Sequence, residues 1–414
     1  MSEFKPVRGT HDILPEAMRR HRRVTDTACE IAARYGYQEI STPIIEFTEV
    51  FQRTLGETSD IVTKEMYTFL DRAGESLTLR PEYTAGVARA LMSGGLQHSL
   101  PLKFFCRGPM FRYERPQKGR QRQFHQIDVE LLGIAEPLGD VEVIALGAHI
   151  LDALGLTDKV TLELNTLGDQ ESRHAYRAKL VSYLERFRDR LSEDSRLRLE
   201  RNPLRIFDSK DEGDKRVIAN APLLRDHLND VSKRFFDQVQ AGLKAAGVAY
   251  EINPRLVRGL DYYCHTAFEF TTETLGAQGA VLAGGRYDGL MTAMGGPPTP
   301  GTGWAAGVER LALMIAEPKA PARPIAVVAA GNGAEIEAFA VAQRLRAEGF
   351  TADVGFSGNL KKRLARANKA GAVAAVILGP AELKKQAATV RDMESGEQTE
   401  VPLSSLGQHL ARYR

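Results

Sequence analysis

Gln123-Phe124-His125-Gln126-Ile127-Asp128-Val129-Glu130-Leu131-Leu132-Gly133 is the stretch from which the organisation of this 414-residue chain can be worked out. From Gln126 onward polar and apolar side chains alternate, which predicts a strand with one apolar face. The other face carries an amide and two carboxylates, on Gln126, Asp128 and Glu130. Polar groups on one face of a central strand are costly to bury unless they have partners, so we expect this face to line a site.

A basic loop joins this strand to an earlier extended, aromatic-rich run at 102–113. The loop contains four cations, one proline and one glycine, and no carboxylate; the cations are Arg115, Lys118, Arg120 and Arg122. A loop this basic, held by strands at both ends, favours contact with phosphates. A solvated basic turn is the alternative. Phe124, at the end of the loop, could stack its ring on a base.

A second hairpin is predicted upstream, from extended runs at 66–70 and 77–82 around a turn at 71–74. If the chain stays extended beyond it, Arg80, Glu82 and Thr84 share one face. This row could form a pocket wall that binds an ammonium group through Glu82 and Thr84. It could equally be the surface end of a strand.

Downstream, Arg258-Gly259-Leu260-Asp261-Tyr262-Tyr263 places a cation, a carboxylate and two phenols within six residues. Such a cluster is costly to bury unless its groups have partners. One interpretation is a turn in which Arg258 pairs with Asp261 and the tyrosines pack. The other is that these groups contact a ligand.

Arg310 is predicted to lie in the first turn of a helix that follows the glycine-rich stretch 301–307. A helix N-terminus favours anions and disfavours a cation. Arg310 is therefore better explained if a phosphate lies opposite it.

Composition and charge bound the class of protein. The apolar fraction of 43% and the charged fraction of 26% are ordinary for a soluble globular protein, and the net charge of +2 excludes a histone-like polycation. No apolar stretch is long enough to span a membrane, and the N-terminus has no signal region. Three widely spaced cysteines fit neither a disulfide framework nor a zinc site, which predicts a cytoplasmic protein without zinc.

The length predicts more than one domain. We expect a first domain at 1–320, interrupted by a charged helical insertion at about 171–246, and a second at 321–414 after a proline-rich linker. Alternating strands and helices predict a small α/β fold for the second domain. One of its helices offers a basic or merely solvated face, formed by Lys361, Lys362, Arg363, Arg366 and Lys369.

These stretches together resemble the class II aminoacyl-tRNA synthetases, and within them the histidyl-tRNA synthetase family, over essentially the whole chain. The motifs that carry the class resemblance are 36–57, Phe111-Arg112-Tyr113-Glu114 with the loop to Phe124, and 303–311. Two stretches are specific to the histidine family: Leu256-Val257-Arg258-Gly259-Leu260-Asp261-Tyr262-Tyr263 and Gly284-Gly285-Arg286-Tyr287-Asp288-Gly289. The resemblance implies an α+β catalytic domain whose antiparallel sheet carries the active site, a helical insertion and a C-terminal α/β anticodon-binding domain.

The resemblance also implies an activity, the ATP-dependent activation of L-histidine to histidyl-adenylate and its transfer to tRNA(His). It implies Mg²⁺ accompanying ATP, no other metal, and a homodimer built through the motif at 36–57. An alternative is a regulatory paralogue of histidine biosynthesis that binds histidine without charging tRNA.

The residue roles that the resemblance implies form three groups. The histidine site would comprise Glu82, Tyr83, Thr84, Gln126, Glu130, Tyr262 and Tyr263. The ATP site would comprise Arg112, Phe124, Arg258 and Arg310, with the three arginines catalytic. The tRNA acceptor end would meet Arg115, Gln117, Lys118, Arg120 and Arg122. Tyr83 and Asp128 depart from the family pattern, which has a glycine in many members at the first position and commonly a small residue at the second.

Overall fold

The computed structural model describes residues 4–56, 59, 61–258, 262–276, 279–331 and 333–413. The chain forms two compact units, Met1–Pro318 and Lys319–Arg414. Each is described by itself.

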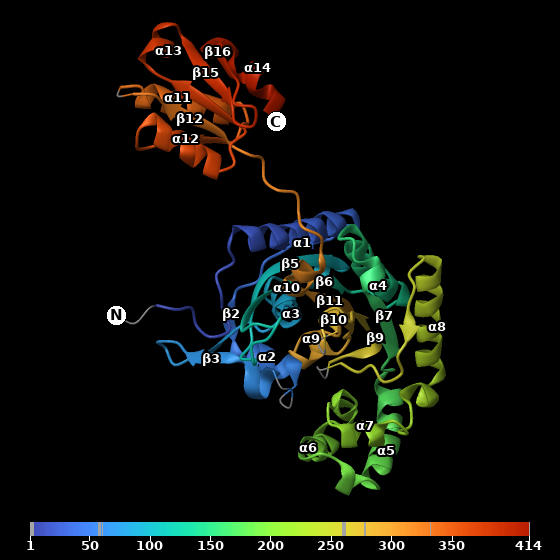
Figure 1. Cartoon of the computed structure of the whole chain (residues 1–414). Helices are drawn as coiled ribbons and strands as arrows, with labels where there is room; N and C mark the ends of the chain where they lie inside the picture. The colour runs from blue at the N-terminus through green and yellow to red at the C-terminus, as the bar shows by residue number, and fades with distance from the viewer. Residues whose placement is uncertain are drawn as a thin grey trace. The chain divides into compact units, whose positions relative to one another are not determined.

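The first unit is built on an eight-stranded sheet with the order β1-β5-β6-β11-β10-β9-β7-β8 (Figure 1). Its strands are β1 (Gln38–Glu39), β5 (Leu102–Phe111), β6 (Gln123–Leu132), β7 (Thr161–Thr166), β8 (Glu251–Ile252), β9 (Cys264–Thr271), β10 (Ala280–Arg286) and β11 (Gly301–Gly307). Pairing is antiparallel from β5 through β7, and only the short edge strands β1 and β8 join in parallel. The predicted antiparallel sheet is confirmed, with parallel strands added at both edges.

One face of the sheet is covered by the helices α1 (Pro15–Arg34), α4 (Pro137–Ala153), α8 (Asp230–Ala245) and α10 (Val308–Met314). Ile127, Val129 and Leu131 of β6 point into this layer and are at most 2% exposed. Because side chains alternate along a strand, Gln126, Asp128 and Glu130 are forced onto the opposite face. The alternation read from the sequence thus sets which face carries the polar groups.

The opposite face has a second apolar cluster and a smaller sheet with the order β2-β4-β3. The elements on this side are β2 (Ile45–Phe47), α2 (Thr48–Leu55), η1 (Ile61–Glu65), β3 (Tyr67–Leu70), β4 (Ser76–Leu79), α3 (Thr84–Ser93), η2 (Leu96–Ser99) and α9 (Leu290–Ala293). The predicted hairpin corresponds to β3 and β4.

The prediction that Arg80, Glu82 and Thr84 share one face of an extended chain is wrong. β4 ends at Leu79 and α3 begins at Thr84, so the chain turns between them. The Arg80 side chain is 3% exposed and donates to the carbonyl oxygens of Thr42 and Pro109. Arg80 therefore holds the turn in place, while Glu82 and Thr84 alone face the polar side of the large sheet.

A helical subdomain interrupts the first unit between β7 and α8 (Figure 1). Its elements are α5 (Gln170–Glu185), η4 (Arg188–Arg190), α6 (Glu193–Arg201), η5 (Pro203–Asp208), α7 (Glu212–Ile218) and η6 (Leu224–His227), and η3 (Thr157–Lys159) precedes β7. A separate apolar cluster between Tyr176 and Leu224 holds it together. The helix that follows, α8, packs on α4 and adds Val239 and Leu243 to the main core.

The second unit is a five-stranded sheet with the order β13-β12-β14-β15-β16 and helices against it. Its elements are β12 (Ile325–Ala329), α11 (Glu335–Ala347), β13 (Ala352–Val354), α12 (Leu360–Lys369), β14 (Ala374–Leu378), α13 (Pro380–Lys384), β15 (Ala387–Asp392), β16 (Gln398–Pro402), η7 (Leu403–Ser405), α14 (Leu406–Leu410) and η8 (Ala411–Tyr413). The predicted α/β fold is confirmed; β16 and α13 were not predicted.

Arg363 does not lie on the exposed basic face predicted for α12. It is 6% exposed and donates to the carbonyl oxygen of Ala329 at 2.6 Å, because α12 packs that edge against β12. The other four cations of the helix are exposed. In the described parts of the chain, no helix combines the length and apolar character needed to cross a lipid bilayer.

Candidate active site

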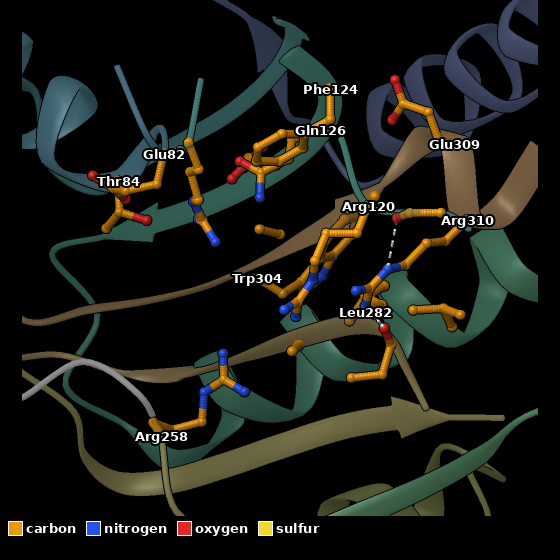
Figure 2. A pocket seen from close by; sticks show the side chains of 18 of the residues that line it. Glu82, Thr84, Arg120, Phe124, Gln126, Arg258, Leu282, Trp304, Glu309 and Arg310 are labelled. Atoms are coloured by element: carbon orange, nitrogen blue, oxygen red, sulfur yellow. Dashed lines mark hydrogen bonds between the residues drawn. The ribbon is translucent and has the colours of Figure 1, made fainter. Parts of the chain in front are cut away.

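A cavity of about 230 Å³ opens on the polar face of the large sheet. β6 contributes Gln126 and Asp128 to its wall, and the turn into α3 contributes Glu82 and Thr84. Figure 2 shows Glu82, Thr84 and Gln126 gathered at one end, Arg120 and Arg310 at the other, and Arg258 pointing into the space between. The cavity therefore has a carboxylate end and a guanidinium end.

Hydrogen bonds at the start of α3 shape the carboxylate end. Glu82 is 5% exposed and accepts a hydrogen bond from the Ala85 backbone N–H at 2.9 Å. Burial raises the pKa of Glu82, although that hydrogen bond and the charge of Arg112 oppose the shift. Thr84 Oγ1 donates to Glu130 Oε1 at 2.5 Å, so Thr84 connects the α3 start to the sheet.

Glu130 lies beneath this end, 1% exposed, with both oxygens hydrogen-bonded: Oε1 by Thr84 and Oε2 by the Tyr287 hydroxyl. Burial raises the pKa of Glu130 to about 8, even though both hydroxyls stabilise its ionised form. Gly303 is required beside it, because a Cβ at that position would lie 2.1 Å from Glu130 Oε2.

Three tyrosine rings form an aromatic wall next to Glu130. The ring of Tyr262 lies 4.6 Å from that of Tyr263 and 5.7 Å from that of Tyr287. Tyr262 and Tyr263 line the cavity. Glu130 and Tyr287 are not among its lining residues.

Arginines line the cavity from beside Glu82 to the opposite end. Arg112 donates from Nε to the Pro81 carbonyl at 2.8 Å and lies 5.4 Å from the centre of the Phe124 ring. Arg310 donates to the carbonyl oxygens of Gly119 and Ala280. Burial lowers the pKa of Arg310, and the charges of Arg120 and Arg112 lower it further. Cations held together against their mutual repulsion favour a polyanionic ligand.

Arg258 forms an ion pair with Glu269 of β9, and their side chains are 15% and 22% exposed. Its guanidinium also lies 5.2 Å from the centre of the Tyr263 ring. The alternative was that Arg258 pairs with Asp261. Asp261 lies outside the described part of the chain, and so do Gly259 and Leu260. The observed partner, Glu269, was not predicted.

Other predicted site residues lie elsewhere. Tyr83 is fully buried and does not line the cavity, because its hydroxyl accepts a hydrogen bond from Arg80 at 2.9 Å on the far side of the turn. Arg115, Gln117 and Lys118 are exposed in the loop. The guanidinium of Arg122 covers the Tyr113 ring at 3.7 Å, and only Arg120 of this predicted set reaches the cavity.

Two functional neighbours were missed by sequence reasoning. Tyr287 lies in the Gly284–Gly289 motif, but no role followed from the motif alone. Glu269 alternates with buried residues along β9, a weak signal that does not identify its partner. Both depend on register between strands that are distant in the sequence.

Among the described residues one group has the spacing of metal ligands, His21, His125 and Glu309, with ligand atoms within 4.8 Å of one another. Glu309 already accepts hydrogen bonds from the His125 backbone N–H at 2.9 and 3.0 Å. These bonds hold His125 and Glu309 together without a metal. The prediction that the protein uses no zinc stays a prediction.

Comparisons with known proteins agree on one family. The family model described as Histidyl-tRNA synthetase matches residues 9–311, and the model described as Anticodon binding domain matches residues 325–412.

Curated relatives match over the full length. The chain is 61% identical to the Histidine–tRNA ligase of Rhodospirillum rubrum, covering 100% of both chains, and 56% identical to that of Gluconacetobacter diazotrophicus, covering 99% of both. The crystal structure of apo histidyl-tRNA synthetase from S. aureus matches with a TM-score of 0.82 at 34% identity, over 98% of this chain and 99% of that one.

Proposed function

The chain belongs to the histidyl-tRNA synthetase family, and from this membership we propose that it is a histidine–tRNA ligase, which activates L-histidine with ATP and transfers it to tRNA(His). Full-length relatives at 45–61% identity are named Histidine–tRNA ligase, so the ligase interpretation holds and the regulatory alternative does not. Within the molecule, the observation that carries the proposal is the division of one cavity into a carboxylate end and a guanidinium end.

The two ends suit the two substrates of the first half-reaction. Glu82, Thr84 and Gln126 would hold the α-ammonium and orient the carboxylate of histidine. Arg112 and Arg310 would bind the phosphates of ATP, with Phe124 near the adenine. This arrangement brings the substrate carboxylate toward the α-phosphorus without a nucleophile from the protein.

The chemical step is an in-line displacement. A carboxylate oxygen of histidine attacks the α-phosphorus of ATP, the bond to the bridging oxygen of pyrophosphate breaks, and histidyl-adenylate remains. Arg258, which points into the cavity between the two ends, would stabilise the charge that develops on the α-phosphate.

The second half-reaction would use the tRNA. A hydroxyl oxygen of the terminal ribose attacks the carbonyl carbon of the adenylate, AMP leaves with the bonding electrons, and the hydroxyl proton passes to a phosphate oxygen of AMP. The exposed cations Arg115 and Lys118, with Gln117 between them and Arg120 and Arg122 nearby, would meet the acceptor end. The second unit, which matches an anticodon-binding domain, would contact the anticodon.

Mg²⁺ accompanies ATP in such reactions and would neutralise phosphate charge. The carboxylates near the guanidinium end already have protein partners: Glu114 contacts Arg120, Glu269 contacts Arg258, and Glu309 contacts His125. These residues do not form a carboxylate cage, which fits an ion held mainly by phosphate oxygens and water.

A homodimer is proposed through the region of the first class motif. The small sheet beside it leaves Ile45, Phe47 and Leu70 exposed at 48%, 53% and 70%. A second copy of the chain would cover these apolar side chains. Light scattering should report the mass of two chains; the mass of one chain at micromolar concentration would contradict the dimer.

Charging of tRNA for translation would place the protein in the cytoplasm.

Glu130→Gln should weaken histidine binding, and the loss should grow with pH. Because the pKa of Glu130 is raised to about 8, the ionised carboxylate becomes available as pH rises through that value. An imidazole N–H would bond more strongly to the carboxylate than to an amide. The dissociation constant of the variant for histidine should therefore exceed that of wild type by about 10-fold or more at pH 8.5. Tyr287 and Glu82 face the same group, and neither is changed by the substitution.

Calorimetric dissociation constants at pH 7.0 and 8.5 would measure the Glu130 effect for both proteins. Equal constants for wild type and variant at both pH values would contradict the role given to Glu130.

The function itself is tested by histidine-dependent exchange of labelled pyrophosphate into ATP, with each of the other amino acids as controls. Exchange with histidine alone, followed by charging of tRNA(His), is expected. No exchange with histidine would exclude adenylate formation, whereas exchange without charging would leave only the first half-reaction.

A further inference from the structure

Asp128 is a buried carboxylate of the cavity wall to which the reaction described above gives no role. It lies on β6 between Cys106 of β5 and Ala305 of β11, and it is 1% exposed. It lines the same cavity as Glu82, Thr84 and Gln126.

The two neighbouring carboxylates have hydrogen-bond donors within the protein, whereas one oxygen of Asp128, Oδ2, has none among the described residues. Glu130 accepts from Thr84 and Tyr287, and Glu82 accepts from the Ala85 N–H. Asp128 Oδ2 is buried and has no hydrogen-bond partner in the described part of the chain. A buried acceptor without a donor costs free energy, which indicates that a ligand supplies the donor.

The nearby guanidinium groups do not supply it. Arg80 and Arg112 attract the Asp128 carboxylate electrostatically. Arg80, however, donates from Nε to Pro109, from Nη1 to Thr42 and from Nη2 to the Tyr83 hydroxyl. Arg112 donates from Nε to Pro81.

A second unpartnered acceptor lies two residues away on the same strand face. Oε1 of Gln126 is also buried and has no hydrogen-bond partner among the described residues. Figure 2 shows Gln126 at the same end of the cavity as Glu82 and Thr84. Adjacent acceptors call for a donor with several N–H groups, and an ammonium has three.

We propose that Asp128 is a substrate-binding residue whose Oδ2 accepts a hydrogen bond from the α-ammonium group of histidine. This inference rests on the proposed function, since it assumes that the amino acid enters the carboxylate end of the cavity. It adds to Glu82 a second carboxylate that directly contacts the substrate's positive charge.

The direction of the pKa shift of Asp128 agrees with this role. Burial raises the pKa of Asp128 well above its ordinary value, and the carboxylates of Glu130 and Glu82 raise it further. A raised pKa means that Asp128 holds a proton more readily. The α-ammonium bound among these three carboxyl groups would supply positive charge in place of that proton. Asp128 then has a reason to be buried that packing does not provide.

The test compares Asp128→Asn with wild type and with a control, Asp158→Asn, at an exposed position. In pyrophosphate exchange the variant's KM for histidine should rise about 10- to 100-fold, the loss expected for one charge-assisted hydrogen bond, while KM for ATP changes little. Inhibition by imidazolepropionate, which is histidine without its α-amino group, should be unchanged. The unfolding midpoint should stay level or rise, since an unpartnered carboxylate is removed.

Each other outcome overturns the proposal. An unchanged KM for histidine would show that Asp128 does not meet the substrate. Equal weakening of histidine and imidazolepropionate would place Asp128 against the imidazole. A lowered unfolding midpoint with unchanged KM would make Asp128 structural. If wild type itself exchanged nothing with histidine, the proposed function would fail, and that result is distinct from all three.

Discussion

Arg258→Lys should lower the rate of histidine-dependent pyrophosphate exchange by about 100-fold or more, because removing one donor aimed at a developing charge costs that much. Lysine keeps the positive charge but loses the planar pair of donors that fits two phosphate oxygens. The side chain points into the cavity between the two substrate ends, where the α-phosphate would lie (Figure 2). The effect should fall on kcat, with a smaller change in KM for histidine.

Lysine is the better first substitution because of Glu269. The ion pair between Arg258 and Glu269 is largely buried, so Arg258→Ala would leave a carboxylate without its partner. The double variant Arg258→Ala/Glu269→Gln removes the cation without leaving that charge unpaired. If the loss of exchange came from the unpaired Glu269, the double variant would recover activity. Near-normal exchange in Arg258→Lys would refute the catalytic role.

Arg286→Leu should lower the free energy of unfolding of the first unit by about 3–5 kcal/mol, the usual cost of breaking a buried ion pair by removing one partner. Both Arg286 and Asp140 have fully buried side chains, and Arg286 Nε donates to Asp140 Oδ2 at 2.9 Å. Arg286 also donates to the carbonyl oxygens of Ile134 and Glu136. This arginine of the family-specific motif therefore joins β10 to α4 and does not reach the cavity.

The chain has a built-in probe for this measurement. Its single tryptophan, Trp304, is 2% exposed in the core of the first unit, so its fluorescence reports unfolding of that unit in urea. The double variant Arg286→Leu/Asp140→Leu should lose less stability than Arg286→Leu, because the fully buried carboxylate is no longer left unpaired; Asp288, the other partner of Arg286, is 37% exposed. Arg34→Ala, which removes an exposed pair with Glu30, should cost no more than about 0.5 kcal/mol. An equal cost for Arg286→Leu and Arg34→Ala would contradict the structural role.

Local pattern predicted much of the fold. The alternation in β6 identified the polar face, because a strand has only two faces and one of them is apolar. Turn residues located the hairpin of β3 and β4. The failure at 80–84 has a clear cause, since the sequence does not record that the Arg80 guanidinium donates to carbonyl oxygens of two other segments, at Thr42 and Pro109, and fixes a turn there.

The site was predicted in its residue types more than in its contacts. Glu82, Thr84, Gln126, Arg258 and Arg310 were named from their patterns and Arg112 from the family resemblance, and all six line one cavity. Tyr83 was placed in the same histidine site, but a helix start turns successive side chains in different directions. Glu130 was also named, yet its depth beneath Thr84 and its contact with Tyr287 were not.

The sequence by itself therefore determined which residues could do the chemistry and which strands and helices carry most of them. Candidate residues and secondary structure both depend on side-chain type and near-neighbour spacing. Tertiary structure alone decided the partners: Glu269 for Arg258, Asp140 for Arg286, Tyr287 for Glu130, and, among the described residues, no hydrogen-bond donor for Asp128 Oδ2. Each of these depends on the register between strands or on a helix packed from far along the chain. Such contacts fix the burial and charge state of a group, and a linear pattern does not contain them.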